Sequence, residues 1–503
     1  MDRLNSAYSQ LATRFATLGH LGAAESTLFW DGRTKMPIGG AASRGKVMAT
    51  LTSVIAEKLA DPALADLLER AEAEEAPQLG EWEAANLREM RRRWRHETAI
   101  PPDLSAELAE RTALSQHAWE RARRESDFAS FTEPLGALLA LQMQVARIKG
   151  DALGMAPYEA MMDAHEPGLT MAFVDALFDD LAAFLTPLLH QIMAKQASEP
   201  APLPLTGPFP EAAQFALSQK LAAMIGYDFD HGRIDLTAHP FANGVPGDVR
   251  ITTRFYDDDP VAGVMATMHE TGHAMYEMGL PGEWAFQPAG FARGMGLHES
   301  QSLLFEMQAG RNHAFLPVLA RLFRESFGGQ GEAWSDENIR RLYRRVEPSF
   351  IRVDADEVTY PLHVILRYRI ERALIDGSLE VAGIPSAWNE LSHELLGIVP
   401  PNDALGCLQD IHWAMGLYGY FPSYTFGAVA AAQLFAAATR QDPDILPALG
   451  RGEFAPLLAW TRANVHAQGS LPPSSDAILR AATGGPLTAD AFKAHLTARY
   501  LEE

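Results

Sequence analysis

Residues 259–276 read DPVAGVMATMHETGHAMY, and after a glycine-rich interval residues 297–302 read LHESQS. The first of these segments has the features of an amphipathic α-helix. Asp259 suits an N-cap, Pro260 suits the first helical turn, and residues 279–281 (Gly-Leu-Pro) favour termination of the helix. Small and apolar residues recur at steps of three and four, which predicts one inward-facing stripe: Val261, Val264, Met265, Met268, Gly272 and Met275.

The predicted helix contains the pattern H-E-x-x-H at residues 269–273. His269 and His273 lie four residues apart, one helical turn, so both imidazoles can reach a single Zn²⁺ ion. Glu270 lies beside them, where it can take a proton from a water molecule that the metal activates. The pattern therefore predicts the metal site of a zinc hydrolase.

The third metal ligand has to come from another part of the chain, and Glu299 is the best candidate. It follows His273 by 26 residues and falls on the first turn of a second predicted helix. Two histidines, one carboxylate and one open position are typical of a catalytic zinc site. His298 is a competing ligand, although neighbouring helical residues point about 100° apart and so do not both bind one ion. Glu299 could instead be a carboxylate that the helix dipole stabilises.

Residues 232–256, directly before the metal helix, contain the one convincing β-sheet of the sequence. Residues 233–236 predict a short strand, and residues 244–247 (Gly-Val-Pro-Gly) predict a turn. Residues 248–255 alternate so that Val249, Ile251, Thr253 and Phe255 share one face. Two interpretations stay open. The sheet edge could bind an extended peptide beside the metal, or the hairpin could simply cap the helical body.

Helical periodicity dominates the rest of the chain. It predicts helices at residues 78–98, 103–126, 130–150, 170–196, 297–327, 335–346, 353–376, 385–397 and 427–440. The proline-rich residues 200–210 form the clearest linker. We therefore predict a mainly α protein that forms a single domain over residues 1–503. Its N-terminal part, 1–200, is helical, and residues 201–503 carry the small sheet and the metal motifs.

Composition narrows the possible partners and compartments. The formal net charge of −22 disfavours nucleic acid and anionic membranes as partners. No apolar run reaches about 18 residues, so no membrane span is expected, and the N-terminus has no signal-peptide core. Cys407 is the only cysteine, which excludes an intrachain disulfide and predicts a small packing residue. These features fit a cytoplasmic protein.

Peptide hydrolysis also needs a hydrogen-bond donor for the tetrahedral intermediate, and a His or Tyr from another segment usually supplies it. A polar island at residues 406–424 offers three candidates, His412, Tyr420 and Tyr424. Each of them could instead be a core residue whose polar tip is satisfied by hydrogen bonding.

Six ordered motifs give the sequence a specific resemblance over nearly its whole length. They are His239-Pro240-Phe241, Asp248-x-Arg250-x-Thr252, His269-Glu270-x-x-His273, His298-Glu299-Ser300-Gln301, Ile351-Arg352-x-x-Ala355-Asp356 and Gly406-x-x-Gln409-Asp410-x-His412-Trp413. With these motifs the chain resembles the carboxypeptidase Taq family of metallocarboxypeptidases. The H-E-x-x-H pattern alone would have indicated only a zinc hydrolase.

The resemblance implies release of single residues from the free C-terminus of peptides, with broad side-chain tolerance. It implies Zn²⁺ as the metal, with Co²⁺ as a possible substitute, and a homodimer. It also implies a two-lobed helical body with a deep groove, similar to angiotensin-converting enzyme and neurolysin. By this likeness His269, His273 and Glu299 bind the metal, and Glu270 is the general base.

The resemblance also indicates substrate-binding residues, His239, Arg250 and Arg352. A carboxypeptidase has to recognise a terminal carboxylate, for which arginine is the natural donor. Both arginines stand in family motifs, and either could instead belong to a structural ion pair. Arg352, for example, can reach Asp356 one turn further on. The sequence leaves this choice open.

Two other functions are compatible with parts of this sequence. A zinc oligoendopeptidase or dipeptidyl carboxypeptidase would use the same ligands, because cleavage mode depends on how the groove is closed. A helical binding protein with a vestigial metal site is the third possibility, and the intact His269, Glu270, His273 and Glu299 argue against it.

Overall fold

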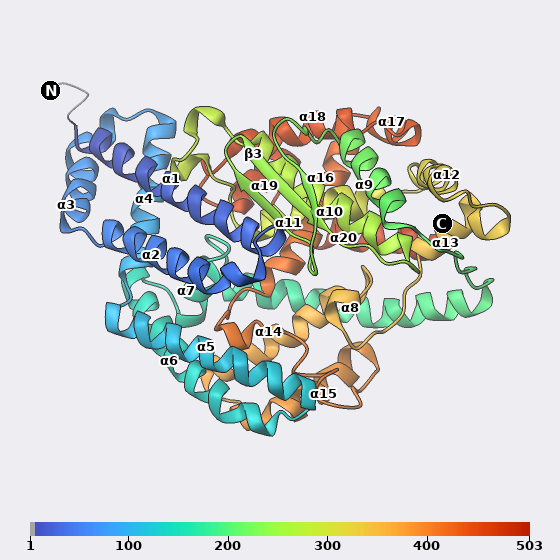
Figure 1. Ribbon diagram of the computed structural model, residues 1–503, viewed down its shortest axis with the longest axis horizontal. Coiled ribbons are helices and arrows are strands. Elements are labelled where there is room, and N and C mark those ends of the chain that lie inside the picture. The colour runs from blue at the N-terminus through green and yellow to red at the C-terminus, as the bar shows by residue number, and fades with distance from the viewer. Residues whose placement is uncertain (1–5, 503) are drawn as a thin grey trace. The chain divides into compact units, whose positions relative to one another are not determined.

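The structure, a computed structural model, describes residues 6–502, and these residues are mainly α-helical (Figure 1). They form the helices α1–α20 and one three-stranded sheet, which confirms the predicted fold class. By their internal contacts they divide into two compact units. Unit 1 comprises residues 1–97, 202–343 and 430–487, and unit 2 comprises residues 98–201, 344–429 and 488–503. The single domain proposed for residues 1–503 stays a prediction.

Unit 1 carries the sheet and most of the helices. Its helices are α1 (Ala7–Thr34), α2 (Ala41–Leu59), α3 (Pro62–Arg70), α4 (Glu81–Thr98), α9 (Glu211–Ile225), α10 (Pro260–Gly279), α11 (Met295–Leu303), α12 (Leu316–Phe327), α13 (Asp336–Tyr343), α17 (Ile445–Arg451), α18 (Ala455–Asn464) and α19 (Ser475–Thr483). One of its apolar clusters joins α1, α3 and α4 through Leu11, Leu64 and Met90, all fully buried.

Unit 2 contains helices but no strand among its described residues. Its helices are α5 (Pro102–Glu125), α6 (Thr132–Leu153), α7 (Pro157–Asp163), α8 (Met171–Ser198), α14 (Tyr360–Asp376), α15 (Ile384–Leu396) and α20 (Asp490–Thr497). The helix α16 (Pro422–Gln441) begins in unit 2 and continues in unit 1 from residue 430. The predicted linker at residues 200–210 has no helix or strand, and the chain passes from unit 2 to unit 1 within it, between Ala201 and Pro202.

The sheet has the strand order β1-β3-β2, with β1 (Ile234–Leu236), β2 (Ala242–Val245) and β3 (Asp248–Thr253). β1 pairs with β3 in parallel, and β2 pairs with β3 as an antiparallel hairpin. Val249, Ile251 and Thr253 are buried, as expected for one face of the strand, but Thr252 of the opposite face is buried as well, and Phe255 lies beyond the end of β3. The prediction of a turn over residues 244–247 was partly wrong, because residues 244 and 245 still belong to strand β2 and only residues 246 and 247 connect the strands.

The predicted metal helix is α10, and it runs beside β3 (Figure 1). Its N-terminus is formed as the sequence predicted: the Asp259 carboxylate accepts hydrogen bonds from the backbone N–H groups of Val261 and Ala262, at 2.8 and 3.3 Å. Farther along, the buried Thr267 hydroxyl bonds to the Thr253 hydroxyl of β3 at 3.1 Å and to the Ser218 hydroxyl of α9 at 2.9 Å. These contacts fix α10 against the sheet and α9.

Two predicted helices differ from the observed ones. The helix expected over residues 297–327 is divided into α11, a π-helical segment at Leu304–Gly310 and α12. The helix expected over residues 353–376 begins only at Tyr360, because residues 352–354 form a separate 3₁₀ turn. The π-helical segment changes the direction in which side chains leave the helix after Leu303, and it contains a residue that contacts the site described below.

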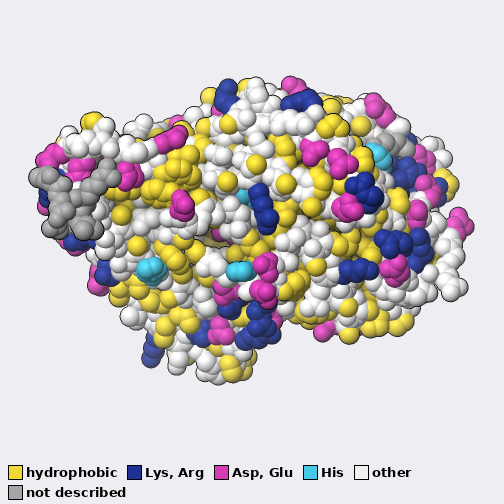
Figure 2. Space-filling view, turned by 90° about the horizontal axis from the view of Figure 1, so that it is seen from above, with side chains coloured by type: hydrophobic (Ala, Val, Ile, Leu, Met, Phe, Trp, Pro, Cys, Tyr) yellow, Lys and Arg dark blue, Asp and Glu magenta, His cyan; other side chains and the backbone are white. Residues whose placement is uncertain are grey.

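Other sequence predictions concern the surface and the lone cysteine. Cys407 is buried, as expected for a packing residue, and burial raises the pKa of its thiol. Among the described residues, no helix is long and apolar enough to cross a membrane. On the face shown in Figure 2, acidic and basic side chains are interspersed among hydrophobic and neutral ones.

Candidate metal centre and active site

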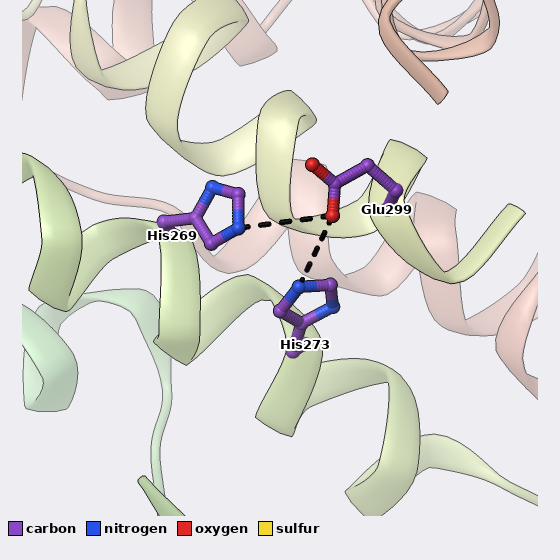
Figure 3. Close-up of side chains that lie close together, drawn as sticks. All are labelled: His269, His273 and Glu299. Atoms are coloured by element: carbon purple, nitrogen blue, oxygen red, sulfur yellow. Dashed lines mark ion pairs between the residues drawn. The ribbon is translucent and has the colours of Figure 1, made fainter. Parts of the chain in front are cut away.

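Three side chains from two helices of unit 1 converge on one point (Figure 3). His269 and His273 come from α10, and Glu299 comes from α11. Glu299 Oε2 lies 3.8 Å from His269 Nε2 and 3.4 Å from His273 Nε2. The two imidazole rings are nearly perpendicular, with 4.9 Å between their centroids. The structure therefore brings together the three residues that the sequence proposed as metal ligands.

Gly272 lets α11 approach α10 closely enough for this convergence. A Cβ atom at this position would lie 2.5 Å from the Gln301 carbonyl oxygen and 2.6 Å from Ser302 Cα. Both of those atoms belong to the backbone of α11, so no side-chain rotation could relieve the overlap. Glycine at the second x of H-E-x-x-H is therefore a packing requirement of this site.

The two distances from Glu299 to the imidazoles fit a single bound zinc ion, and all three donor atoms lie within 4.8 Å of one another. Metal–ligand distances of ~2.0–2.2 Å in a tetrahedral arrangement place ligand atoms about 3.3–3.6 Å apart. The separations of 3.4 and 3.8 Å from Glu299 Oε2 agree with this range to within a few tenths of an ångström. Two imidazoles and a carboxylate are also the donor set of catalytic zinc sites.

The charges around this point favour a cation. Burial alone would lower the pKa of His269, but the carboxylates of Glu299, Glu306 and Glu270 raise it to about 10. Burial likewise opposes ionisation of Glu299, yet His269 and His273 lower its pKa to about 2. Burial lowers the pKa of His273 to about 4, so this imidazole is neutral, as a metal ligand has to be. The group thus stabilises positive charge beside Glu299, carried by a proton or by a divalent ion.

Glu270 has a different environment from Glu299. Its side chain is only 6% exposed, and its Oε2 atom is buried without a hydrogen-bond partner among the described residues. Burial raises its pKa to about 7. A carboxylate with a pKa near neutrality and an unpartnered oxygen can accept a proton from a water molecule beside it.

Sequence reasoning missed a residue that orients His269. The Nδ1 atom of His269 lies 2.9 Å from Glu306 Oε2, and Arg311 Nη2 donates to the other oxygen of Glu306 at 2.8 Å. Carboxylates in this position fix the orientation and tautomer of a metal-binding histidine. Glu306 lies in the π-helical segment after α11, so its approach to α10 depends on the docking of the two helices. No local pattern in the sequence indicates it.

The competing ligand His298 lies outside the group of three. Its Nδ1 atom is 2.7 Å from His273 Nδ1, the ring nitrogen that faces away from Glu299. Its Nε2 atom is 2.8 Å from the Glu277 carboxylate. Helical periodicity could have drawn attention to Glu277, since it follows His273 by four residues on the same helix.

The two predicted substrate residues of unit 1 lie in or next to the sheet. Arg250 forms an ion pair with Asp248 at 2.5 Å, and its guanidinium carbon lies 4.4 Å from the centre of the Trp30 ring. The positive charge of Arg250 is therefore neutralised locally. His239 is exposed between β1 and β2, and its backbone oxygen accepts a hydrogen bond from Thr237.

The remaining predicted residues form one cluster in unit 2. His412 Nε2 lies 3.3 Å from the Tyr424 hydroxyl, and the Tyr420 and Tyr424 rings are 5.2 Å apart. The Arg352 guanidinium carbon lies 5.1 Å from the centre of the Tyr424 ring. The structure therefore brings Arg352, His412, Tyr420 and Tyr424 together, although their sequence positions span more than 70 residues.

Arg352 pairs with a different carboxylate from the one that the sequence suggested. Its Nη2 donates to Asp410 Oδ1 at 2.8 Å, whereas the Asp356 carboxylate accepts from backbone N–H groups. The fully buried Arg367 donates to the other Asp410 oxygen at 2.6 Å. Two guanidinium groups therefore share one carboxylate, which leaves one uncompensated positive charge among these three side chains.

Burial and the two arginines together determine the ionisation of Asp410 and His412. Burial opposes ionisation of Asp410, but Arg367 and Arg352 hold its pKa below the usual range. Burial lowers the pKa of His412 to about 4, and the two arginines add to this effect although Asp410 opposes it. A neutral His412 can donate one hydrogen bond without carrying a charge of its own.

Comparisons with known proteins agree with this geometry. The family model of the carboxypeptidase Taq (M32) metallopeptidases matches residues 10–500. Thermostable carboxypeptidase 1 of Thermus thermophilus is 38% identical over 506 residues, covering 98% of each chain. Carboxypeptidase 1 of Bacillus subtilis is 34% identical over 484 residues, covering 96% of each chain. The solved structure of Trypanosoma cruzi metallocarboxypeptidase 1 is 38% identical, with a TM-score of 0.96 over 98% of this chain and 99% of that one. The chain therefore belongs to the carboxypeptidase Taq (M32) family and is a metallocarboxypeptidase.

Proposed function

We propose that this protein releases single amino acids from the free C-terminus of peptides, with His269, His273 and Glu299 as the ligands of a Zn²⁺ ion. The observation that carries the proposal is the convergence of these three donor atoms at zinc-ligand spacing beside the buried Glu270. Co²⁺ suits the same donor set and would substitute for Zn²⁺.

The residues around the metal position have distinct roles in this proposal. A bound divalent ion supplies Lewis-acid chemistry, because it polarises the scissile carbonyl and lowers the pKa of a nearby water. Glu270 takes the proton from that water and then delivers it to the amine that leaves. Glu306 and Arg311 hold His269 in the orientation that presents Nε2.

Arg352 is the stronger candidate for binding the terminal carboxylate. Asp248 neutralises Arg250, whereas Arg352 belongs to a group with two guanidinium charges and one carboxylate. A substrate carboxylate would compensate the excess charge, and arginine binds carboxylates bidentately. We assign hydrogen bonding of the tetrahedral intermediate to His412, Tyr420 or Tyr424. The proposal also includes broad side-chain tolerance, a role of His239 in substrate binding, a homodimer and a cytoplasmic location. The family resemblance and the composition support these points.

The test is the hydrolysis of a short peptide and of the same peptide with an amidated C-terminus, followed by mass spectrometry of the products. We expect the free peptide to lose one residue at a time, the amide to resist cleavage, and a chelator to abolish the activity until Zn²⁺ or Co²⁺ is restored. Equal cleavage of the amide would contradict the carboxypeptidase assignment and favour an oligoendopeptidase. Release of dipeptides would identify a dipeptidyl carboxypeptidase.

The same pair of peptides distinguishes the two arginines. Arg352→Gln removes the donor for the terminal carboxylate, so we expect the preference for the free acid over the amide to shrink. Arg250→Gln is the matched control and should leave the preference unchanged. The opposite result would assign the carboxylate to Arg250.

A further inference from the structure

Besides the hydrogen bond between His269 and Glu306, a second series of hydrogen bonds begins at the proposed ligand His273 and leads away from the metal position. We call this series the His273 hydrogen-bonded chain. It runs from His273 Nδ1 to His298 Nδ1 at 2.7 Å, and from His298 Nε2 to Glu277 Oε1 at 2.8 Å. The side chains of His273, His298 and Glu277 are 15%, 20% and 25% exposed, so all three are largely shielded from water. His273 and Glu277 lie one turn apart on α10, and His298 reaches between them from α11.

The positions of the protons in this chain follow from its chemistry. A carboxylate only accepts hydrogen bonds, so the proton between His298 and Glu277 is carried by His298 Nε2. Of the two facing Nδ1 atoms, one has to donate and the other has to accept. When His273 donates from Nδ1, its Nε2 atom keeps a free lone pair directed at the metal position, 3.4 Å from Glu299 Oε2. When His298 donates instead, His273 carries its proton on Nε2 and cannot bind a metal.

Packing holds this chain in place. The rings of His273 and His298 are 4.6 Å apart, and the fully buried Tyr276 lies against His298 at 5.4 Å between ring centres. Gly244 of β2 lies against Glu277: a Cβ atom at Gly244 would meet Glu277 Cγ at 2.8 Å. The sheet thus confines the carboxylate at the outer end of the chain.

We propose that Glu277 and His298 are positioning residues that hold His273 with its proton on Nδ1. They thereby strengthen metal binding at His273, whose Nδ1 atom contacts an imidazole and not a carboxylate. The inference rests on the proposed metal site. It gives the two histidine ligands different supports, because His269 bonds directly to Glu306 whereas His273 reaches Glu277 only through a second imidazole. It also gives the hairpin a role in supporting the metal helix.

The test measures metal affinity and does not depend on turnover. Zn²⁺ dissociation constants are determined by competition with a chromogenic chelator for the wild type, Glu277→Leu, His298→Phe and the double variant. We expect each single variant to bind Zn²⁺ about 10–100-fold more weakly. Since the two residues act in series, the double variant should bind no more weakly than His298→Phe. Glu277→Gln, which keeps an acceptor oxygen, should recover most of the affinity.

The matched control is Glu283→Leu, which removes an exposed carboxylate six residues after Glu277 and should leave the affinity unchanged. The visible absorption spectrum of the Co²⁺-loaded protein gives a second readout, because a reoriented His273 alters the ligand field whereas a general loss of stability does not. If His298→Phe fails to fold, Glu277→Leu and Glu277→Gln carry the comparison.

Unchanged affinity and an unchanged Co²⁺ spectrum in Glu277→Leu would overturn the inference, and so would additive losses in the double variant. In both cases the wild type would still bind one metal ion, and the proposed function would stand. A wild type without stoichiometric metal binding would instead overturn the proposed function, and the inference with it.

Discussion

Glu270 and Glu299 both belong to the candidate metal centre, where Glu270 is buried and Glu299 is partly buried, yet their pKa values move in opposite directions. The pKa of Glu299 falls to about 2 because two histidines face it, despite the opposing effect of burial. The pKa of Glu270 rises to about 7 because burial dominates and its Oε2 atom has no partner among the described residues. Two groups of the same type, 29 residues apart in sequence, thus have the ionisation that a ligand and a proton acceptor need.

Replacement of Glu270 by Gln tests whether Glu270 is the proton acceptor and not a metal ligand. The amide cannot accept the proton, so kcat should fall by about 10²–10⁴-fold while the Zn²⁺ content stays at that of the wild type. Because the base acts when it is deprotonated, kcat/KM of the wild type should rise with pH. A bound cation lowers the pKa of Glu270, so the midpoint of this rise should lie at or below pH 7. Near-normal turnover in Glu270→Gln would assign the base to another residue.

At the scale of secondary-structure elements, local patterns predicted the metal helix well. The capping carboxylate, the proline at the first turn and the periodic apolar stripe of α10 are all short-range signals, and the structure confirms the helix at Pro260–Gly279. Pairings between distant elements could not be read in this way. Glu306 reaches His269 only because α11 docks on α10, and Arg352 bonds to Asp410, 58 residues further along the chain. Strand β2 was missed, because Gly244 is also a common turn residue.

Substitution of Gly272 by Ala tests the contact between α10 and α11. The added Cβ would meet backbone atoms of α11 at 2.5 and 2.6 Å, so the helices have to separate and Glu299 moves away from the histidines. We expect a loss of stability of about 1–3 kcal/mol in chemical denaturation, together with weaker Zn²⁺ binding. Gly45→Ala on α2, where nothing lies within 4 Å of the new Cβ, is the control and should stabilise the protein by up to about 1 kcal/mol. Gly272→Ala with unchanged metal affinity would show that the close approach does not determine the site.

At the scale of the whole molecule, the candidate site residues fall in two units that alternate along the sequence. The chain passes between them at residues 97/98, 201/202, 343/344, 429/430 and 487/488. The three proposed ligands, Glu270 and the residues that support the ligands all belong to unit 1, whereas the cluster around Asp410 belongs to unit 2. Neither unit is a continuous stretch of sequence, so a truncation at any single crossing would divide at least one of them, and a truncation at 201/202, 343/344 or 429/430 would divide both.

Because the three proposed ligands all belong to unit 1, removal of the metal should destabilise helices of unit 1. A bound ion stabilises the conformation that presents its ligands, by about 2.7 kcal/mol when its free concentration is 100 times the dissociation constant. Chelation should therefore speed amide hydrogen exchange by up to about 100-fold in α10 and α11, where the ligands lie, and leave α14 and α15 of unit 2 nearly unchanged. Exchange measured by mass spectrometry before chelation, after it and after addition of Zn²⁺ gives the comparison, and restored protection excludes irreversible damage. Equal acceleration in both units would show that they open together, so that metal binding stabilises the entire chain and not unit 1 alone.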